Sequence, residues 1–359
     1  MIRVAFHAPM KSPCSPVPSG DREMARNLMA AIAAGGARVD LVSELKTHDK
    51  AGDADAQARA RDLATAEIAR LTHALGSDPP ALWVTYHNYY KAPDLIGPAV
   101  SRALGLPYVQ IESTRARKRL SGAWADFAVA AEAACDAAAV IFHLTANDLI
   151  TLKRHRPPGQ SLIRLRPFLP VAQLPNASDC AGAMLAAGMM RTGDKLDSYR
   201  IVADTLGRLR GPWHLNIAGD GPARGTIEAM MAPFGARVRF LGQLDRDALA
   251  SAYGRASLFF WPGVNEAFGM VYLEAQAAGL PVVAQNRPGV RDILLPGDYP
   301  RPGQGAGALA SRIQTLLDNP ALRRDLGAKA RAMIARRHLM AGATETFWSA
   351  VTPLLDAAP

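Results

Sequence analysis

Cysteine is scarce in this chain of 359 residues, which holds only Cys14, Cys135 and Cys180. Their odd number and scattered spacing fit neither a disulfide framework nor a set of metal ligands. This usage is typical of a reducing compartment, so we expect a cytoplasmic protein. No uninterrupted apolar run is long enough to span a bilayer. The N-terminal segment MIRVAFHAPM has too short an apolar stretch for a signal peptide and predicts a first buried strand.

Motifs of several functional classes are also missing. The turn after the first predicted strand, HAPMKSPCSPVPSGD, contains no G-x-G-x-x-G, so a dinucleotide-binding dehydrogenase is not expected. No D-x-D pair lies near the end of a predicted strand, so no metal site is expected. Aromatic residues make up 6% of the chain and do not alternate with its basic clusters, so nucleic acid is not an expected partner.

Positive charge is in excess, with a formal net charge of +9. Such a surface favours an anionic partner, for example a phosphate-bearing substrate. The basic residues form small clusters, at 115–119, 153–156 and 336–337. The same charge allows peripheral contact with an anionic membrane, which would place the protein at the inner membrane face.

Predicted strands and helices alternate along the chain in two series, separated by a proline-rich stretch from Pro157 to Pro170. This alternation predicts an α/β fold with parallel sheets covered on both faces. The length allows two domains, each with its own core. The predicted helices include Asp94–Leu104, Leu120–Ala134 and one with Pro222 at its first position, after the turn Gly219-Asp220-Gly221.

Residues 257–284, SLFFWPGVNEAFGMVYLEAQAAGLPVVA, form the most informative stretch. The run Ser257–Trp261 is short, aromatic and closed by Pro-Gly, which predicts a buried strand. A loop follows, and Met270–Ala278 predicts a helix that stops at Gly279. The stretch is therefore expected to be a strand–loop–helix unit.

The start of that predicted helix suits an anion. The backbone N–H groups of Phe268, Gly269 and Met270 would be unpaired there, and the helix dipole adds positive potential. Gly269 lets a phosphate approach the backbone without meeting a Cβ atom. With Glu266 before this pocket and Glu274 eight positions later, two carboxylates could meet hydroxyl groups on either side of a bound diphosphate.

The string NEAFGMVYLEAQAAGLPVV, residues 265–283, closely resembles the donor-sugar signature of the retaining family 4 glycosyltransferases. The resemblance implies the GT-B fold, in which two Rossmann-like domains face each other across a cleft. In that family the first Glu of the signature touches the transferred sugar and the second holds the nucleotide ribose, which implies these roles for Glu266 and Glu274. The implied domains are an acceptor domain over 1–168, a donor nucleotide-sugar domain over 169–338 and a C-terminal helix over 339–359 that crosses back to the first domain.

Other residues resemble further parts of the family's donor site. Arg191 and Lys195, in MMRTGDKLDSY, resemble the Arg and Lys that clamp the donor diphosphate, although Leu196 stands where the family usually has Gly. Cations there would stabilise the departing nucleoside diphosphate, which is the electrostatic work that a metal does in other enzymes. The glycine turns and main-chain positions that resemble those near the nucleotide are Gly219, Gly221, Leu241 and Gly242.

Two features of the N-terminal half leave alternatives open. The segment containing Gly20 resembles the family's N-terminal glycine loop, and it is equally compatible with a plain helix start capped by Ser19 or Asp21. Many family members place a His after the fourth strand, but this chain has Glu112 there. Either Glu112 or His87, at the end of the preceding predicted strand, is expected on the acceptor side. A buried His87 without substrate contact fits equally well.

The function implied by the resemblance is metal-independent, retaining transfer of a sugar from a nucleoside diphosphate donor. The acceptor hydroxyl would belong to a glycan, a lipid-linked molecule or a small molecule, and no cofactor is expected. The alternatives are another GT-B enzyme, such as a sugar-nucleotide epimerase or a phosphorylase, and a non-catalytic sugar-nucleotide-binding or assembly protein. The missing His and the altered clamp favour the non-catalytic alternative slightly.

Overall fold

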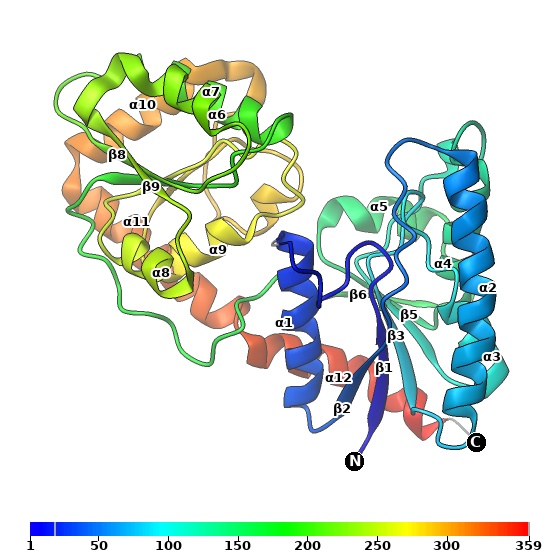
Figure 1. Cartoon of the computed structure of the whole chain (residues 1–359). Coiled ribbons are helices and arrows are strands. Elements are labelled where there is room, and N and C mark those ends of the chain that lie inside the picture. The colour runs from blue at the N-terminus through cyan, green and yellow to red at the C-terminus, as the bar shows by residue number, and fades with distance from the viewer. Residues whose placement is uncertain (18, 358–359) are drawn as a thin grey trace. The chain divides into compact units, whose positions relative to one another are not determined.

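The computed structural model describes residues 1–17 and 19–357, which form two compact units. One unit comprises Met1–Arg166 and Met340–Pro359, and the other comprises Pro167–Leu339. Each is built on one parallel sheet (Figure 1). Residues 358 and 359, at the end of the segment predicted over 339–359, lie outside the described residues.

The first unit contains a six-stranded sheet in the order β2-β1-β3-β4-β5-β6. All residues of the third and fourth strands are buried, as expected for strands covered on both faces. The strands are β1 (Arg3–His7), β2 (Arg38–Ser43), β3 (Leu82–Tyr86), β4 (Tyr108–Ile111), β5 (Val140–His143) and β6 (Ser161–Arg164).

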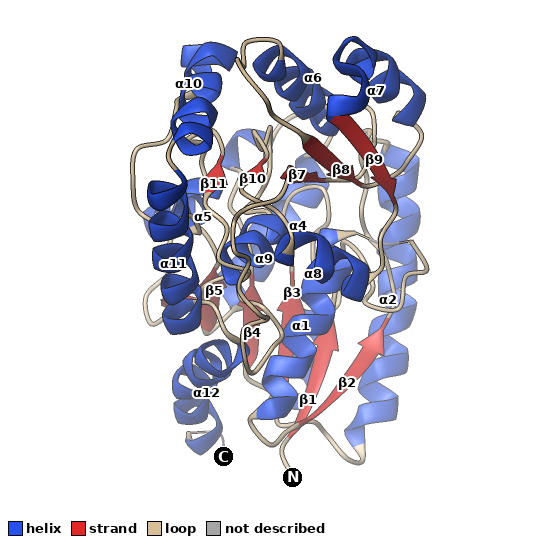
Figure 2. Ribbon diagram, turned by 90° about the vertical axis from the view of Figure 1, so that its left-hand side faces the viewer, coloured by secondary structure: helices blue, strands red, loops and turns tan. Residues whose placement is uncertain are grey.

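Helices cover both faces of this sheet, with α2, α3 and α4 on one side and α1 and α12 on the other (Figures 1 and 2). Their bounds are α1 (Gly20–Ala34), α2 (Ala54–Gly76), α3 (Gly97–Leu104), α4 (Ala125–Ala137), α5 (Ala146–Arg154) and α12 (Met340–Asp356). The C-terminal helix is fixed to α1 because Thr344 Oγ1 donates to the carbonyl of Ala31 at 2.9 Å and Trp348 Nε1 donates to that of Ile32 at 3.1 Å.

Two helices of this unit start later than the sequence predicted. Helix α3 begins at Gly97 rather than Asp94, because the Asp94 carboxylate accepts the N–H groups of Ile96 and Gly97 and so ends the loop before the helix. Helix α4 begins at Ala125 rather than Leu120, since the chain first makes a 3-10 turn and passes Gly122 with φ +84. The sequence analysis also missed α5 and β6.

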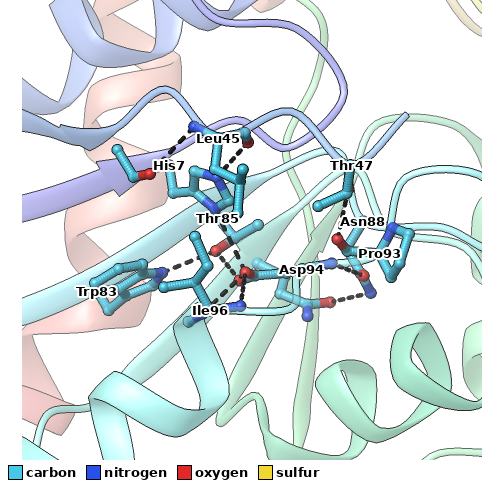
Figure 3. Close-up of polar contacts among 12 residues, drawn as sticks. His7, Leu45, Thr47, Trp83, Thr85, Asn88, Pro93, Asp94 and Ile96 are labelled. Atoms are coloured by element: carbon cyan, nitrogen blue, oxygen red, sulfur yellow. Dashed lines mark hydrogen bonds and ion pairs between the residues drawn. The ribbon is translucent and has the colours of Figure 1, made fainter. Parts of the chain in front are cut away.

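Asp94 is buried beneath the carboxyl ends of β1 and β3 (Figure 3). Its carboxylate accepts from the hydroxyls of Thr85 and Tyr108 and lies 3.4 Å from His7 Nδ1. Burial alone would raise the pKa of Asp94, but His7 and the surrounding N–H and O–H donors outweigh it and hold the pKa at about 2. The network fixes the loop after β3, which begins with His87.

The second unit contains a five-stranded sheet in the order β11-β10-β7-β8-β9. Helices α6 and α7 lie on one side of it and α8 and α9 on the other (Figure 1). The strands are β7 (Met184–Ala187), β8 (Leu215–Ala218), β9 (Val238–Gly242), β10 (Phe259–Phe260) and β11 (Val282–Val283). The helices are α6 (Asp194–Leu206), α7 (Arg224–Met231), α8 (Arg246–Gly254), α9 (Met270–Ala277), α10 (Gly305–Asp318) and α11 (Pro320–Arg337).

One predicted helix start in this unit is wrong. Helix α7 begins at Arg224, so Pro222 lies in the preceding turn instead of at the first helical position. The N–H of Ala223 is held by the carbonyl of Met190 at 2.9 Å, and this contact keeps the turn extended by two residues. None of the helices in the described part of the chain combines the length and apolarity that crossing a bilayer requires.

Candidate functional site

Helix α9 starts with unpaired donors at the carboxyl end of β10. Within the described structure, the N–H groups of Phe268, Gly269 and Met270 form no hydrogen bond. Gly269 has φ +79, and a Cβ atom there would lie 2.8 Å from the ring of Tyr272. The glycine therefore lets the chain turn sharply into the helix, whose first three donors have no partner within the described structure.

The structure brings two predicted site residues together beside this helix. Glu266 Oε1 accepts hydrogen bonds from Lys195 Nζ, in the first turn of α6, and from Trp261 Nε1 at 3.0 Å. The Lys195 amine also lies 5.6 Å from the centroid of the Trp261 ring. The side chains of Lys195 and Glu266 are 25% and 14% exposed, so a ligand can reach a charge pair that is partly desolvated.

Trp261 contacts both members of this pair, and the sequence analysis gave it no functional role. Its ring meets that of Tyr199 edge-on at 5.0 Å, and its carbonyl accepts from the Tyr272 hydroxyl at 3.1 Å. A Cβ atom at Gly188 would lie 2.9 Å from the Trp261 ring. The sequence feature that could have indicated this role is the position of Trp261 at the end of a predicted buried strand, directly before the loop that carries Glu266.

The loop between β10 and α9, which carries Glu266 and is called the signature loop here, is anchored to the first turns of α6. Asn265 Nδ2 donates to Asp194 Oδ1 at 2.7 Å, and the N–H of Val264 donates to Ser198 Oγ at 3.1 Å. Asn265 adopts φ +49, a left-handed conformation that Asn tolerates better than most residues. These contacts hold the loop so that Glu266 reaches Lys195.

Glu274 is located one turn inside α9, where Tyr253 in α8 donates its hydroxyl to Glu274 Oε2 at 3.0 Å. Burial raises the pKa of Tyr253 well above its usual value, and the negative charge of Glu274 adds to the effect. Tyr253 therefore stays protonated and keeps the Glu274 carboxylate oriented. This arrangement provides a fixed acceptor for hydroxyl groups.

The glycines of the predicted nucleotide turn have a structural role. A Cβ atom at Gly219 would lie 2.0 Å from the carbonyl oxygen of Gly188, and one at Gly221 would lie 2.5 Å from that of Met190. The N–H of Gly219 donates to the carbonyl of Gly242 at 2.8 Å. The turn thus packs backbone against backbone next to the loop that carries Arg191.

The remaining predicted residues lie on other elements of the chain. Arg191 is exposed between β7 and α6, and Leu241 is partly buried in β9. Gly20 is the first residue of α1, and Ser19 caps that helix by accepting the N–H of Arg22 at 3.2 Å. Within residues 1–17 and 19–357, no group of three or more His, Cys, Asp or Glu side chains is arranged to hold a metal.

In the first unit, His87 and Glu112 directly follow the adjacent strands β3 and β4, with φ +70 and +56. His87 Nδ1 lies 3.7 Å from Asp21 Oδ1. Burial raises the pKa of Glu112 well above its usual value, and the charges of Asp148 and Asp21 add to the effect. Burial lowers the pKa of His87, although the same two carboxylates oppose this. Glu112 therefore keeps its proton to a higher pH than an ordinary carboxyl, and His87 loses its proton at a lower pH than an ordinary imidazole, so Glu112 can act as the proton donor of the two.

Residues 197–333, from α6 to α11, match the family model described as Glycosyl transferases group 1. This part of the chain matches a group 1 glycosyltransferase domain. The matched region includes Glu266, the start of α9 and Glu274, and it begins two residues after Lys195. The predicted relationship to this glycosyltransferase family is confirmed.

A relative from Arabidopsis thaliana, the sulfoquinovosyl transferase SQD2, is 32% identical over 111 residues, which are 31% of this chain and 21% of that protein. The chain thus matches about a fifth of that relative's length. Sucrose-phosphate synthase from Thermosynechococcus elongatus superposes with a TM-score of 0.73 at 19% identity, and the match covers 99% of this chain and 100% of that protein's chain. HepE from Anabaena in complex with UDP-glucose superposes with a TM-score of 0.71 at 16% identity, and the match covers 98% of this chain and 100% of the HepE chain. These likenesses confirm the predicted GT-B fold.

Proposed function

We propose that this protein is a retaining glycosyltransferase that moves a hexosyl group from a nucleoside diphosphate sugar to a hydroxyl acceptor. The observation that carries the proposal is the Lys195–Glu266 pair beside the unpaired N–H groups at the start of α9. Glu266 and the start of α9 lie within the region that matches the group 1 family model. Cation, carboxylate and amide donors at one place suit a ligand with phosphates next to a sugar.

The donor would bind with its diphosphate at the start of α9. There the N–H groups of Phe268, Gly269 and Met270 donate to phosphate oxygens, and Lys195 turns from Glu266 toward the phosphate, with Arg191 as a second cation. Glu266 keeps its bond from Trp261 and accepts a hydroxyl of the sugar. A bound UDP-glucose in HepE makes a uridine donor the first to test.

The reaction breaks the bond between the anomeric carbon of the sugar and the phosphate oxygen, and the electron pair leaves with the nucleoside diphosphate. The acceptor oxygen bonds to the same face of that carbon, and its proton passes to a phosphate oxygen of the leaving group. Lys195 and the α9 donors stabilise the negative charge that develops on the diphosphate. We propose that no metal or other cofactor is needed, because these groups supply the charge stabilisation.

The acceptor is proposed to bind to the first unit, where Glu112, whose pKa is raised by burial, and His87 can hydrogen-bond a hydroxylated molecule. The net charge of +9 supports an acceptor that is itself anionic or is presented at the cytoplasmic face of an anionic membrane. Sedimentation with vesicles of anionic and of neutral lipid would separate these two cases.

The deciding experiment is a thermal-shift panel of nucleoside diphosphate sugars on the full chain, since a ligand that binds only the folded state raises Tm. The donor that stabilises the protein is then incubated with hydroxyl acceptors, and NMR reads the anomeric configuration of the product. We expect release of nucleoside diphosphate with retention. Inversion would overturn the retaining mechanism, inorganic phosphate as the best acceptor would indicate a phosphorylase, and binding without turnover would indicate a non-catalytic protein.

A further inference from the structure

The second unit has a hollow of about 630 Å³ at the amino edge of its sheet. Because all strands of this sheet run parallel, that edge is opposite the carboxyl edge from which the chain enters the Glu266 loop. The hollow is lined by Met184 at the start of β7, by Trp213 and Ser257 just before β8 and β10, and by Arg323 in the first turns of α11. It is thus formed by segments far apart in the sequence.

Three polar atoms of these lining residues are buried without a hydrogen bond in the described structure: Ser257 Oγ, Trp213 Nε1 and Arg323 Nε. Their residues are 2%, 3% and 9% exposed. A buried polar atom is normally paired, because leaving it unpaired costs its desolvation. A group of three such atoms around one hollow points to a missing ligand.

All three atoms can donate a hydrogen bond, which defines the chemistry of that ligand. The guanidinium of Arg323 is always charged, and its Nη1 donates to the carbonyl at the end of α10 at 3.0 Å, so its position is fixed. Arg210 and His214 line the hollow from its exposed rim. Asp318 also lines it, but that carboxylate is exposed and accepts from Gln314 Nε2 at 2.9 Å.

The Trp213 ring provides an apolar wall that does not move freely. The Arg237 guanidinium lies 4.6 Å from its centroid, and Phe234 meets it edge-on at 5.7 Å. Pro212 and Leu317 extend the apolar surface. The hollow therefore combines three groups that can donate hydrogen bonds with room for a carbon skeleton.

We propose that this hollow binds the oxyanion of a small metabolite, a phosphate or a carboxylate group, held by Arg323, Trp213 and Ser257. The anion oxygens accept from the guanidinium, the indole and the hydroxyl, while the rest of the molecule lies against Trp213. The bound anion links α11 to the starts of β8 and β10 and so stabilises the second unit. This site is independent of the donor site proposed beside α9.

The test measures binding of inorganic phosphate, glycerol 1-phosphate and citrate to the full chain by calorimetry and by thermal shift. Ser257→Ala removes one donor with little change of shape. Trp213→Phe removes the indole N–H and keeps an aromatic, although smaller, wall, so Arg323, which also caps α10, need not be altered. Losing one hydrogen bond to a charged ligand should weaken binding roughly tenfold or more. Ser311→Ala, at an exposed serine on α10, is the matched control and should bind as the unaltered chain does.

The donor site could also bind phosphate, so each anion is measured again in Lys195→Met. We expect the anion-dependent rise in Tm to persist in Lys195→Met and to be weakened in Ser257→Ala and Trp213→Phe. Tighter binding of inorganic phosphate and glycerol 1-phosphate would indicate a phosphate ligand, and tighter binding of citrate would indicate a carboxylate ligand. The proposal is overturned if none of the three anions binds, as when water alone fills the hollow, or if Lys195→Met removes binding while the two hollow variants keep it.

Discussion

Lys195 Nζ donates a hydrogen bond to Glu266 Oε1, although 71 positions separate the two residues in the chain. The contact exists because α6 follows β7 while the Glu266 loop follows β10, and these strands are neighbours in the sheet. Without a ligand each charge neutralises the other next to Trp261. A bound diphosphate would compete with Glu266 for the amine, so the pair couples phosphate binding to the orientation of the sugar-binding carboxylate.

Replacing Lys195 by Met should lower kcat/KM for transfer about 100-fold or more, the effect of removing one preorganised donor to a developing negative charge. The measurement is nucleoside diphosphate release with the donor found in the thermal-shift panel. Arg200→Met is the matched control, because Arg200 is exposed on the same helix and pairs with Asp197 at the surface. A Lys195→Met variant as active as Arg200→Met would contradict the assignment.

Glu274→Gln should raise the KM for the donor about tenfold and leave kcat nearly unchanged, because a contact to the ribose is made equally in the ground state and the transition state. Tyr253→Phe removes the hydroxyl that orients this carboxylate and should have a smaller effect in the same direction. Initial rates over a range of donor concentrations decide this. A loss confined to kcat would show that Glu274 acts in the chemical step.

Gly269→Ala tests the helix start. Its φ of +79 and the 2.8 Å approach of a Cβ atom to the Tyr272 ring predict a loss of about 1–3 kcal/mol in the free energy of unfolding, together with weaker donor binding. Urea denaturation and donor titration measure the two effects. Gly225→Ala, in the first turn of α7 with no neighbour within 4 Å, is the control and should not destabilise the protein. Equal stability of the two variants would disprove the strain argument.

The second unit could be predicted from the sequence where each signal was local. The strand before Trp261, the loop and helix α9 were predicted within two residues, since an aromatic run, a glycine and a 3.6-residue period all lie in one stretch. The Gly279 stop is confirmed by its φ of +74. The choice of Lys195 and Glu266 as site residues followed from the family resemblance and not from periodicity, and their hydrogen bond to each other was not predicted.

Features that depend on distant residues could not be predicted. Helix α3 starts later than predicted because the Asp94 carboxylate is fixed by His7, Thr85 and Tyr108 in the loop before the helix. These three partners are distant from Asp94 in the sequence or give no local pattern, so the network could not be predicted. The hollow at the amino edge of the second sheet is built from residues 213, 257 and 323, each of an ordinary type for its position. Only the fold brings their unpaired donors together.

Glu112→Gln should make stability less dependent on pH. The native pKa of Glu112 lies above its unfolded value, so the native state holds a proton that the unfolded state loses above about pH 4.5, and stability falls as pH rises through this range. Gln keeps the shape and remains neutral. Relative to the unaltered chain, the variant should gain about 1 kcal/mol or more between pH 5 and pH 8.

Urea denaturation at both pH values measures this gain. Glu345→Gln, at an exposed position on α12, controls for the loss of a carboxylate and should follow the unaltered chain at both pH values. If Glu112→Gln shows the same pH dependence as Glu345→Gln, Glu112 is ionised in the native state and its assignment as a proton donor is wrong.

Asp94→Asn tests the network that positions the loop of His87. The native pKa of about 2 lies below the usual 3.8, so the carboxylate contributes about 2 kcal/mol that is fully present above pH 4 and is lost as pH falls toward 2. The Oδ1 of an Asn can still accept the N–H groups of Ile96 and Gly97, but its NH2 group cannot accept the hydroxyl hydrogens of Thr85 and Tyr108, and the negative charge beside His7 is lost. We therefore expect Asp94→Asn to lose about 3 kcal/mol or more of stability at neutral pH.

The same substitution should reduce sensitivity to acid, because the group that titrates is gone. Thermal unfolding from pH 5 to pH 2.5 should give a smaller fall in Tm for Asp94→Asn than for the unaltered chain. Asp78→Asn is the control, since this carboxylate is 84% exposed and meets Arg3 at the surface, where an ion pair contributes little. An acid-induced fall in Tm as large in Asp94→Asn as in Asp78→Asn would mean that His7 and the hydroxyls do not hold Asp94 ionised, and the depressed pKa would be wrong.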